Sequence, residues 1–116
     1  MNATYNLCSL VVNGSEVEFN HNVYNVLEFD NLMVVHLLDV GEDKSVQMSG
    51  QPVNNVYAVD FEGKVLWNIK DKIGEDALYV LIKKESSDLL KVTNFKGFKK
   101  TINVVTGELF NVGYTK

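Results

Sequence analysis

The stretch VNNVYAVDFEGKVLWNI, residues 53–69, decides the fold class. It contains two runs of β-branched and aromatic residues, Val53–Asp60 and Lys64–Ile69, which are separated by a short polar turn, Asp60–Gly63. An Asp that opens a turn, with Gly three positions later, is typical of a type I turn closed by a glycine in the left-handed conformation. The stretch therefore predicts an antiparallel β-hairpin.

Similar turn signals recur along the chain. Asn94–Gly97 repeats the pattern of Asp60–Gly63 as a weak internal repeat, and Val105–Glu108 contains another turn glycine. Asn13-Gly14 suits a two-residue type I′ turn, because both residues adopt positive φ at little cost. The strands that these turns would join include Tyr5–Val12 with Glu16–Asn20 and Thr101–Val104 with Leu109–Tyr114. Turns spaced about ten residues apart favour antiparallel pairing.

The segments between these hairpins have different patterns. Val23–Phe29 alternates as a strand with one wet face does, and Asp30-Asn31 follows it as a turn. Leu32–Val40 is almost continuously apolar, which predicts a central strand covered on both faces. Gly41–Pro52 is the longest predicted loop and contains the only proline. Asp76–Leu90 has some helical spacing, but we favour strand and hairpin over helix.

Composition places these elements in one domain. The chain has 116 residues, of which 46% are hydrophobic and 22% charged, as expected for one packed core. We predict a mainly β fold over residues 1–116: a single-domain antiparallel β meander, sandwich or half-barrel with at most one short helix. Cys8 has no second cysteine to pair with, and residues 1–6 do not resemble a signal peptide. We therefore expect a cytoplasmic protein.

Charge is distributed unevenly along the chain. Residues 1–60 contain eight acidic residues and one lysine, whereas residues 91–116 contain one acidic residue and five lysines. The acidic set that we predict to bind a partner is Asp39, Glu42, Asp43, Glu16, Glu18 and Glu28. The alternative, a nucleic-acid face with interleaved lysines and aromatics, comprises Lys96, Phe98, Lys99 and Lys100. Solvated surface remains the plainer interpretation of each set.

Reactive chemistry has little support in the sequence. Cys8, His21 and His36 lie at no recognised metal-ligand spacing, and no glycine loop of a phosphate-binding kind is present. We expect neither catalysis nor a metal or cofactor. His36 is interpreted as a hydrogen-bonded core or interface histidine, His21 as a loop residue and Cys8 as a small buried hydrophobe. A hydrolase or isomerase built on His36 and nearby acids is the remaining catalytic alternative.

Two resemblances extend this interpretation. Asn55–Ile69 is similar to a β-propeller blade hairpin of the pyrroloquinoline-quinone-repeat kind, and Asn103–Leu109 is similar to a second fragment; this implies hairpins with Trp67 as a packing anchor, without cofactor or substrate. As a whole, the short, acidic, Asn- and Lys-rich chain resembles bacterial immunity proteins. That resemblance implies a non-enzymatic protein that blocks a cognate toxin, such as a nuclease domain. The alternative function is a single-stranded nucleic-acid-binding module.

Overall fold

The computed structural model describes residues 3–39 and 50–109, and within them almost all regular structure is β. The strands are β1 (Ala3–Asn6), β2 (Ser9–Val12), β3 (Ser15–Glu18), β4 (Val23–Glu28), β5 (Met33–Leu37), β6 (Val56–Val59), β7 (Val65–Asn68), β8 (Tyr79–Lys84), β9 (Leu89–Asn94) and β10 (Lys99–Asn103). One five-residue helix, α1 (Ile69–Ile73), lies between β7 and β8. Among the described residues, no helix has the length and apolarity that crossing a bilayer requires.

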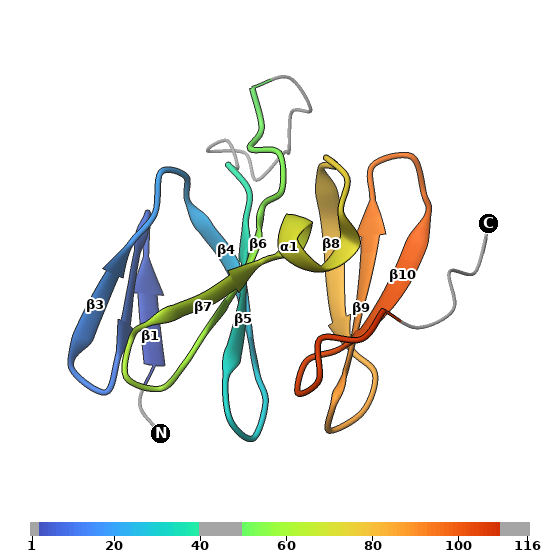
Figure 1. The fold of residues 1–116 in the computed structure, drawn as a ribbon. Coiled ribbons are helices and arrows are strands. Elements are labelled where there is room, and N and C mark those ends of the chain that lie inside the picture. The colour runs from blue at the N-terminus through green and yellow to red at the C-terminus, as the bar shows by residue number, and fades with distance from the viewer. Residues whose placement is uncertain (1–2, 40–49, 110–116) are drawn as a thin grey trace.

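The strands form three antiparallel sheets whose order follows the chain: β1-β2-β3, β4-β5-β6-β7 and β8-β9-β10. Figure 1 shows these sheets side by side, with the four-stranded sheet between the two smaller ones. We call them the first, central and third sheets. The predicted antiparallel meander is confirmed, and the three sheets pack as layers.

The central strand β5 is buried on both faces, as its apolar run predicts. Met33, Val35 and Leu37 belong to a core cluster shared with the first sheet, which includes Leu10 and Val12. On the other face, Val34 belongs to a second cluster that includes Ile82, Leu90 and Ile102 of the third sheet. Successive side chains of a strand point to opposite faces, so a strand that lies between two cores is apolar on both faces; the exception in β5 is His36, which is buried with a hydrogen bond to the Tyr79 carbonyl.

The predicted glycine turns are confirmed, and two of them close with the same hydrogen bonds. Asp60 Oδ1 accepts from the amides of Glu62 and Lys64, while the Gly63 amide donates to the Asp60 carbonyl. Asn94 Oδ1 likewise accepts from two later amides, and Gly97 closes that turn at φ 90°. Both hairpins are therefore closed by an Asx side chain followed by a left-handed glycine.

Two local predictions are wrong. Tyr5–Val12 is not one strand: the chain reverses at Leu7 and Cys8, so Asn6 pairs with Ser9. Lys64–Ile69 is not strand to its end, because α1 begins at Ile69. A capping box starts this helix, with Asn68 Oδ1 accepting from the Lys70 amide and Asp71 Oδ2 accepting from the Asn68 amide.

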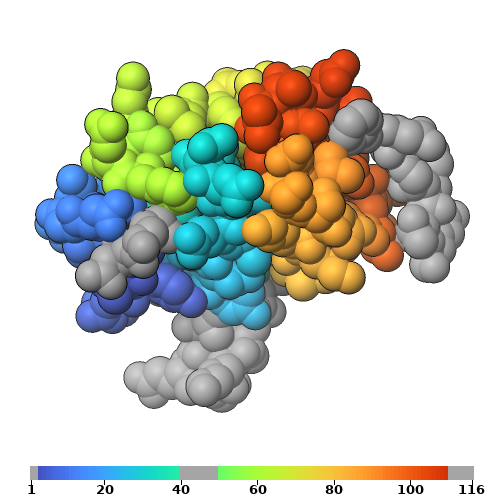
Figure 2. Space-filling view, turned by 90° about the horizontal axis from the view of Figure 1, so that it is seen from below, coloured from blue at the N-terminus to red at the C-terminus, as the bar shows by residue number. Residues whose placement is uncertain are grey.

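The remaining predictions fall partly within the described residues. Asp76–Leu90 contains β8, a turn and the start of β9, which confirms strand over helix. Leu109 forms an isolated bridge with Ile102, while residues 110–114 of the predicted last strand lie outside the described residues. At the end of the molecule seen in Figure 2, the β4–β5 turn in cyan, the β8–β9 turn in orange and the turn after β10 in red lie next to one another.

Candidate functional site

Two of the predicted acidic residues project together from the first sheet. Within β3, Val17 is buried and Glu16 and Glu18 are exposed, because alternate side chains of a strand share a face. Ser9 Oγ on β2 donates to Glu16 Oε2 at 2.6 Å, and this hydrogen bond lowers the pKa of Glu16. The Glu16 carboxylate is therefore held in place from the neighbouring strand, beside the exposed Glu18 on the same face.

Asp39 lies after β5 and connects several segments. Its carboxylate accepts from His21 Nδ1 at 2.7 Å and from the Asn22 amide at 3.0 Å. Partial burial raises the pKa of Asp39, but the bonds from Asn22 and His21 outweigh it and leave the pKa lowered. The Gln51 side chain also bonds both backbone polar groups of Asp39. Asp39 therefore joins the segment after β5 to residues 21, 22 and 51, and its carboxylate is already hydrogen-bonded.

The structure does not bring all the predicted acidic residues into one patch. Glu28 pairs with Met33 at one end of the β4–β5 hairpin, while Asp39 follows the opposite end, beyond Leu37. Glu42 and Asp43, with most of the predicted Gly41–Pro52 loop, lie outside the described residues. Glu16 and Glu18 are thus the pair that shares one exposed strand face.

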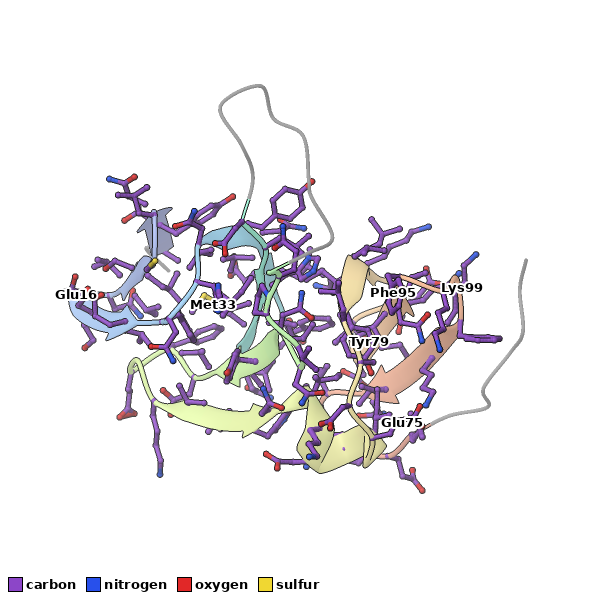
Figure 3. All side chains as sticks on the ribbon, turned by 90° about the horizontal axis from the view of Figure 1, so that it is seen from above. Glu16, Met33, Glu75, Tyr79, Phe95 and Lys99 are labelled. Atoms are coloured by element: carbon purple, nitrogen blue, oxygen red, sulfur yellow. The ribbon has the colours of Figure 1, made fainter. Side chains whose placement is uncertain are left out.

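The net charge nevertheless separates between the two ends of the fold. Residues 3–39 contain five carboxylates and no lysine or arginine, whereas residues 79–109 contain six lysines and three carboxylates. Figure 3 shows Glu16 and Lys99 at opposite sides of the molecule. The first sheet and the β4–β5 hairpin form what we call the acidic end, and the third sheet forms the basic end.

The predicted basic face is divided by strand alternation. Lys100 pairs with Val92 and points inward, where its Nζ bonds Glu75 Oε1 at 2.5 Å with only 15% of the side chain exposed. Lys96 lies in the β9–β10 turn, with its Nζ 6.0 Å from the centre of the Phe95 ring. Phe98 and Lys99 follow that turn as neighbours in sequence, so the four predicted residues do not share one face.

A different set of lysines gathers on the outer face of the third sheet. Lys83 pairs with Lys91, and Thr93 pairs with Lys99, in adjacent rows across the three strands. These residues and Leu81 line a shallow hollow of about 220 Å³. Glu85 balances part of the charge, at 3.6 Å from Lys83 and 3.5 Å from Lys91. The sequence pattern includes Lys91 in the basic stretch from Lys91 to Lys100 but does not include Lys83, because the face that these two lysines share is visible only once strand register is known.

The catalytic alternative depends on the surroundings of the two histidines and the cysteine. His36 is 1% exposed, and its Nε2 donates to the Tyr79 carbonyl at 2.8 Å, which confirms a buried, hydrogen-bonded histidine. Burial lowers the pKa of His36. Cys8 Sγ donates to Asn22 Oδ1 at 3.4 Å, and the Asn22 amide in turn binds Asp39. Cys8 is thus tied to the His21–Asp39 pair through Asn22.

No group of three or more potential metal ligands occurs among residues 3–39 and 50–109. The Nε2–H of His36 binds a backbone carbonyl, so His36 lacks the carboxylate partner that orients a catalytic base. In this part of the chain the polar groups with buried side chains, His36 and Asn55, are used to join sheets.

Comparison with known proteins adds a family. Residues 1–114 match a family model described as a domain of unknown function (DUF7957). The chain belongs to this family. The match covers nearly the whole sequence, so the three sheets described above lie within the family's domain. No curated protein and no solved structure gives a significant match.

Proposed function

We propose that this DUF7957 domain is a non-enzymatic protein-binding module, specifically an immunity-type inhibitor whose acidic end binds and occludes a basic toxin domain such as a nuclease. The observation that carries this proposal is the absence of lysine and arginine from residues 3–39, which contain five carboxylates. A surface of one charge sign attracts a partner of the opposite sign over distances near the Debye length, about 8–10 Å in physiological salt.

Exposed apolar residues supply the contact area that charge alone lacks. Tyr5 on β1 is 47% exposed and Leu7 in the following turn is 70% exposed, on the same sheet as Glu16 and Glu18. Protein interfaces combine an apolar centre with a polar rim, and tyrosine is enriched at their centres. In the proposed complex the carboxylates steer the partner, and the apolar side chains exclude water once it has docked.

The test is binding to the protein encoded beside this one, measured by calorimetry at several salt concentrations. Glu18→Lys is expected to weaken binding by about tenfold or more, mainly through a slower association rate. Glu108→Lys is the matched control, because it makes the same charge change on an exposed residue after the third sheet. Equal effects of the two substitutions, or binding that does not depend on salt, would contradict the proposed surface.

The outer face of the third sheet supports a second candidate, the single-stranded nucleic-acid module. Its support is the gathering of Lys83, Lys91 and Lys99 around one hollow, in place of the set predicted from sequence. Replacing all three by Glu is expected to abolish retention of single-stranded DNA at low salt, whereas Lys64→Glu, in the β6–β7 turn, leaves it unchanged. A wild-type protein that retains no DNA at low salt excludes this function.

A further inference from the structure

A hollow of about 290 Å³ lies at the end of the molecule that Figure 2 views, and neither proposal above uses it. Its walls come from segments far apart in the chain: the β4–β5 turn, β7 with α1, the β8–β9 turn and the turn after β10. The volume is near the lower end of the range for small-molecule pockets, roughly 300–1,000 Å³. It is large enough for one ring-sized ligand.

The segments around this hollow are held together by specific contacts. The Val104 amide donates to the Asp88 carbonyl at 2.8 Å, which joins the β8–β9 turn to the segment after β10. Lys72 on α1 passes close to Gly107, where its Nζ is 2.8 Å from the position that a Cβ would occupy. Gly107 has φ 79°, and this left-handed conformation is what favours glycine in the turn, since the Lys72 ammonium is the mobile end of a long side chain. The hollow is therefore part of the fold's packing.

One wall of the hollow is the indole of Trp67, the only tryptophan in the chain. The ring is partly exposed, and Lys72 Nζ lies 5.7 Å from its centre. Leu66 and Val105, which are 44% and 62% exposed, extend the apolar surface beside it. A flat aromatic face bordered by aliphatic groups binds ligands that present an apolar C–H face.

Four polar residues at the rim of the hollow have side chains that are available to a ligand. Asp30, Asn31, Ser87 and Asp88 are exposed and line the hollow, and their side chains form no hydrogen bond or ion pair with the rest of the described chain. Together they offer carboxylate acceptors, an amide with both donor and acceptor, and a hydroxyl. Such a rim can pair with several hydroxyl groups of one ligand.

The balance of charge narrows the ligand class. Asp30 and Asp88 disfavour an anionic ligand such as a phosphate ester, while the Lys72 ammonium near the indole repels a ligand cation. A neutral ring with several hydroxyl groups meets neither repulsion. It would place its C–H face on Trp67 and its hydroxyls on the two carboxylates and Asn31.

We propose that this hollow is a binding site for a neutral saccharide of about one pyranose ring, stacked on Trp67 and hydrogen-bonded by Asp30, Asn31 and Asp88. A site whose polar groups match ligand hydroxyls discriminates against analogues that leave those groups unpaired. The saccharide site shares the β4–β5 turn with the acidic end, but its Trp67 and Asp88 lie outside that end, on β7 and in the β8–β9 turn. Loss of saccharide binding in Asp88→Ala can therefore be distinguished from loss of partner binding in Glu18→Lys.

The experiment is a fluorescence titration of the full chain, in which Trp67 is the only tryptophan to report. The probes are the methyl glycosides of glucose, galactose, mannose and N-acetylglucosamine, with the matching uronic acid and 2-amino sugar of each as charged analogues. At least one neutral glycoside is expected to give a saturable change in emission, and the charged analogue of that sugar is expected to bind about tenfold more weakly.

Substitutions separate a built site from general stacking on an exposed indole. Asp88→Ala and Asn31→Ala, both at exposed turn positions, are each expected to weaken binding by about tenfold, equivalent to roughly 1.4 kcal/mol. Lys83→Ala, on the outer face of the third sheet, is the control and is expected to leave affinity unchanged. The proposal is overturned if no neutral glycoside gives a saturable change, if the charged analogue binds equally well, or if Asp88→Ala binds as the wild type does.

Discussion

The side chain of Asn55 bonds both backbone polar groups of Tyr79. Asn55 Oδ1 accepts from the Tyr79 amide at 2.9 Å, and Asn55 Nδ2 donates to the Tyr79 carbonyl at 2.8 Å and to the Leu37 carbonyl at 2.8 Å. Asn55 precedes β6 of the central sheet and Tyr79 begins β8 of the third. The buried side-chain amide of Asn55 thus hydrogen-bonds β8 as the backbone of a neighbouring strand would.

Asn55→Ala is expected to destabilise the fold strongly. The change leaves the Tyr79 amide without its partner and opens a small cavity, since Asn55 is 1% exposed. We expect a loss of ~2–4 kcal/mol in the free energy of unfolding, measured by urea denaturation. Asn31→Ala, at an exposed turn position, is the control and is expected to change stability by less than about 0.5 kcal/mol. Similar losses for the two variants would show that Asn55 does not join the sheets.

Because of His36, we expect the free energy of unfolding to decrease in mild acid. Its folded-state pKa lies below the ordinary value of 6.5, because burial disfavours the charged ring, so the unfolded chain binds the proton more readily. Stability is therefore independent of this group well above pH 6.5 and decreases as the pH falls below it, with a slope approaching ~1.4 kcal/mol per pH unit until the depressed pKa is reached.

The measurement is chemical denaturation of wild type and His36→Gln between pH 8 and pH 5, an interval chosen to include the titration of a free histidine, about pH 6.5. His36→Gln should show a smaller slope because it removes the titrating ring, while His21 is the same in both proteins. The carboxylates of Asp39 and Asp76 act in a separate, more acidic range, because their lowered pKa values lie below 3.8. Parallel pH profiles for the two proteins would contradict the prediction.

Gly63 and Gly97 occupy equivalent turns but have different surroundings, which allows two effects to be separated. Both have φ near 90°, at 87° and 90°. A Cβ on Gly97 would meet nothing within 4 Å, whereas one on Gly63 would lie 2.9 Å from Ser15 Cβ. Gly97→Ala is therefore expected to cost ~1–2 kcal/mol of unfolding free energy through backbone strain alone.

Gly63→Ala is expected to cost a further ~1–3 kcal/mol, because the added methyl group overlaps Ser15 on β3. The double variant Gly63→Ala with Ser15→Gly removes the overlapping atom and should recover that further cost, after the effect of Ser15→Gly alone is subtracted. Thermal or urea unfolding of the four proteins forms a double-mutant cycle. A coupling energy near zero would mean that the β6–β7 turn does not pack on β3 as described.

These glycine turns also show what could be predicted from the sequence. Asp60 and Asn94 set their hairpins through bonds to residues at most four positions later, so the signal is local and readable. The reversal at Leu7 and Cys8 lacks such a signal, since neither residue is a usual turn former and Leu7 adopts φ 53°. There the pairing of β1 with β2, a tertiary preference, overrides the local one.

The sites were less predictable than the fold because they depend on register and on contacts between distant segments. Lys99 and Lys100 are adjacent in sequence, yet one lines the outer hollow and the other bonds Glu75. The hollow beside Trp67 joins turns that are about 75 residues apart at the extremes, a relation that no spacing rule contains. Helix α1 did have a sequence signal, the Asn68 and Asp71 capping box followed by Gly74.

Lys83 and Lys91 lead to a prediction that connects stability with the proposed nucleic-acid surface on the outer face of the third sheet. They lie directly opposite each other on β8 and β9, and like charges in that position destabilise a sheet. Lys83→Thr should therefore raise the free energy of unfolding by ~0.2–1 kcal/mol at low salt, even though it removes the weak contact with Glu85. The gain should shrink as salt screens the repulsion.

Denaturation at two salt concentrations measures this difference, with Lys64→Thr as a control in a turn where no lysine lies opposite. If Lys83→Thr is more stable but binds single-stranded DNA less tightly, then the paired lysines are kept at a cost to stability because the surface needs their charge. A variant that is no more stable than wild type at low salt would show that Glu85, within 4 Å of both amines, already neutralises the repulsion. In that case the lysines would gain little from binding a nucleic-acid phosphate, and this result would count against the nucleic-acid module.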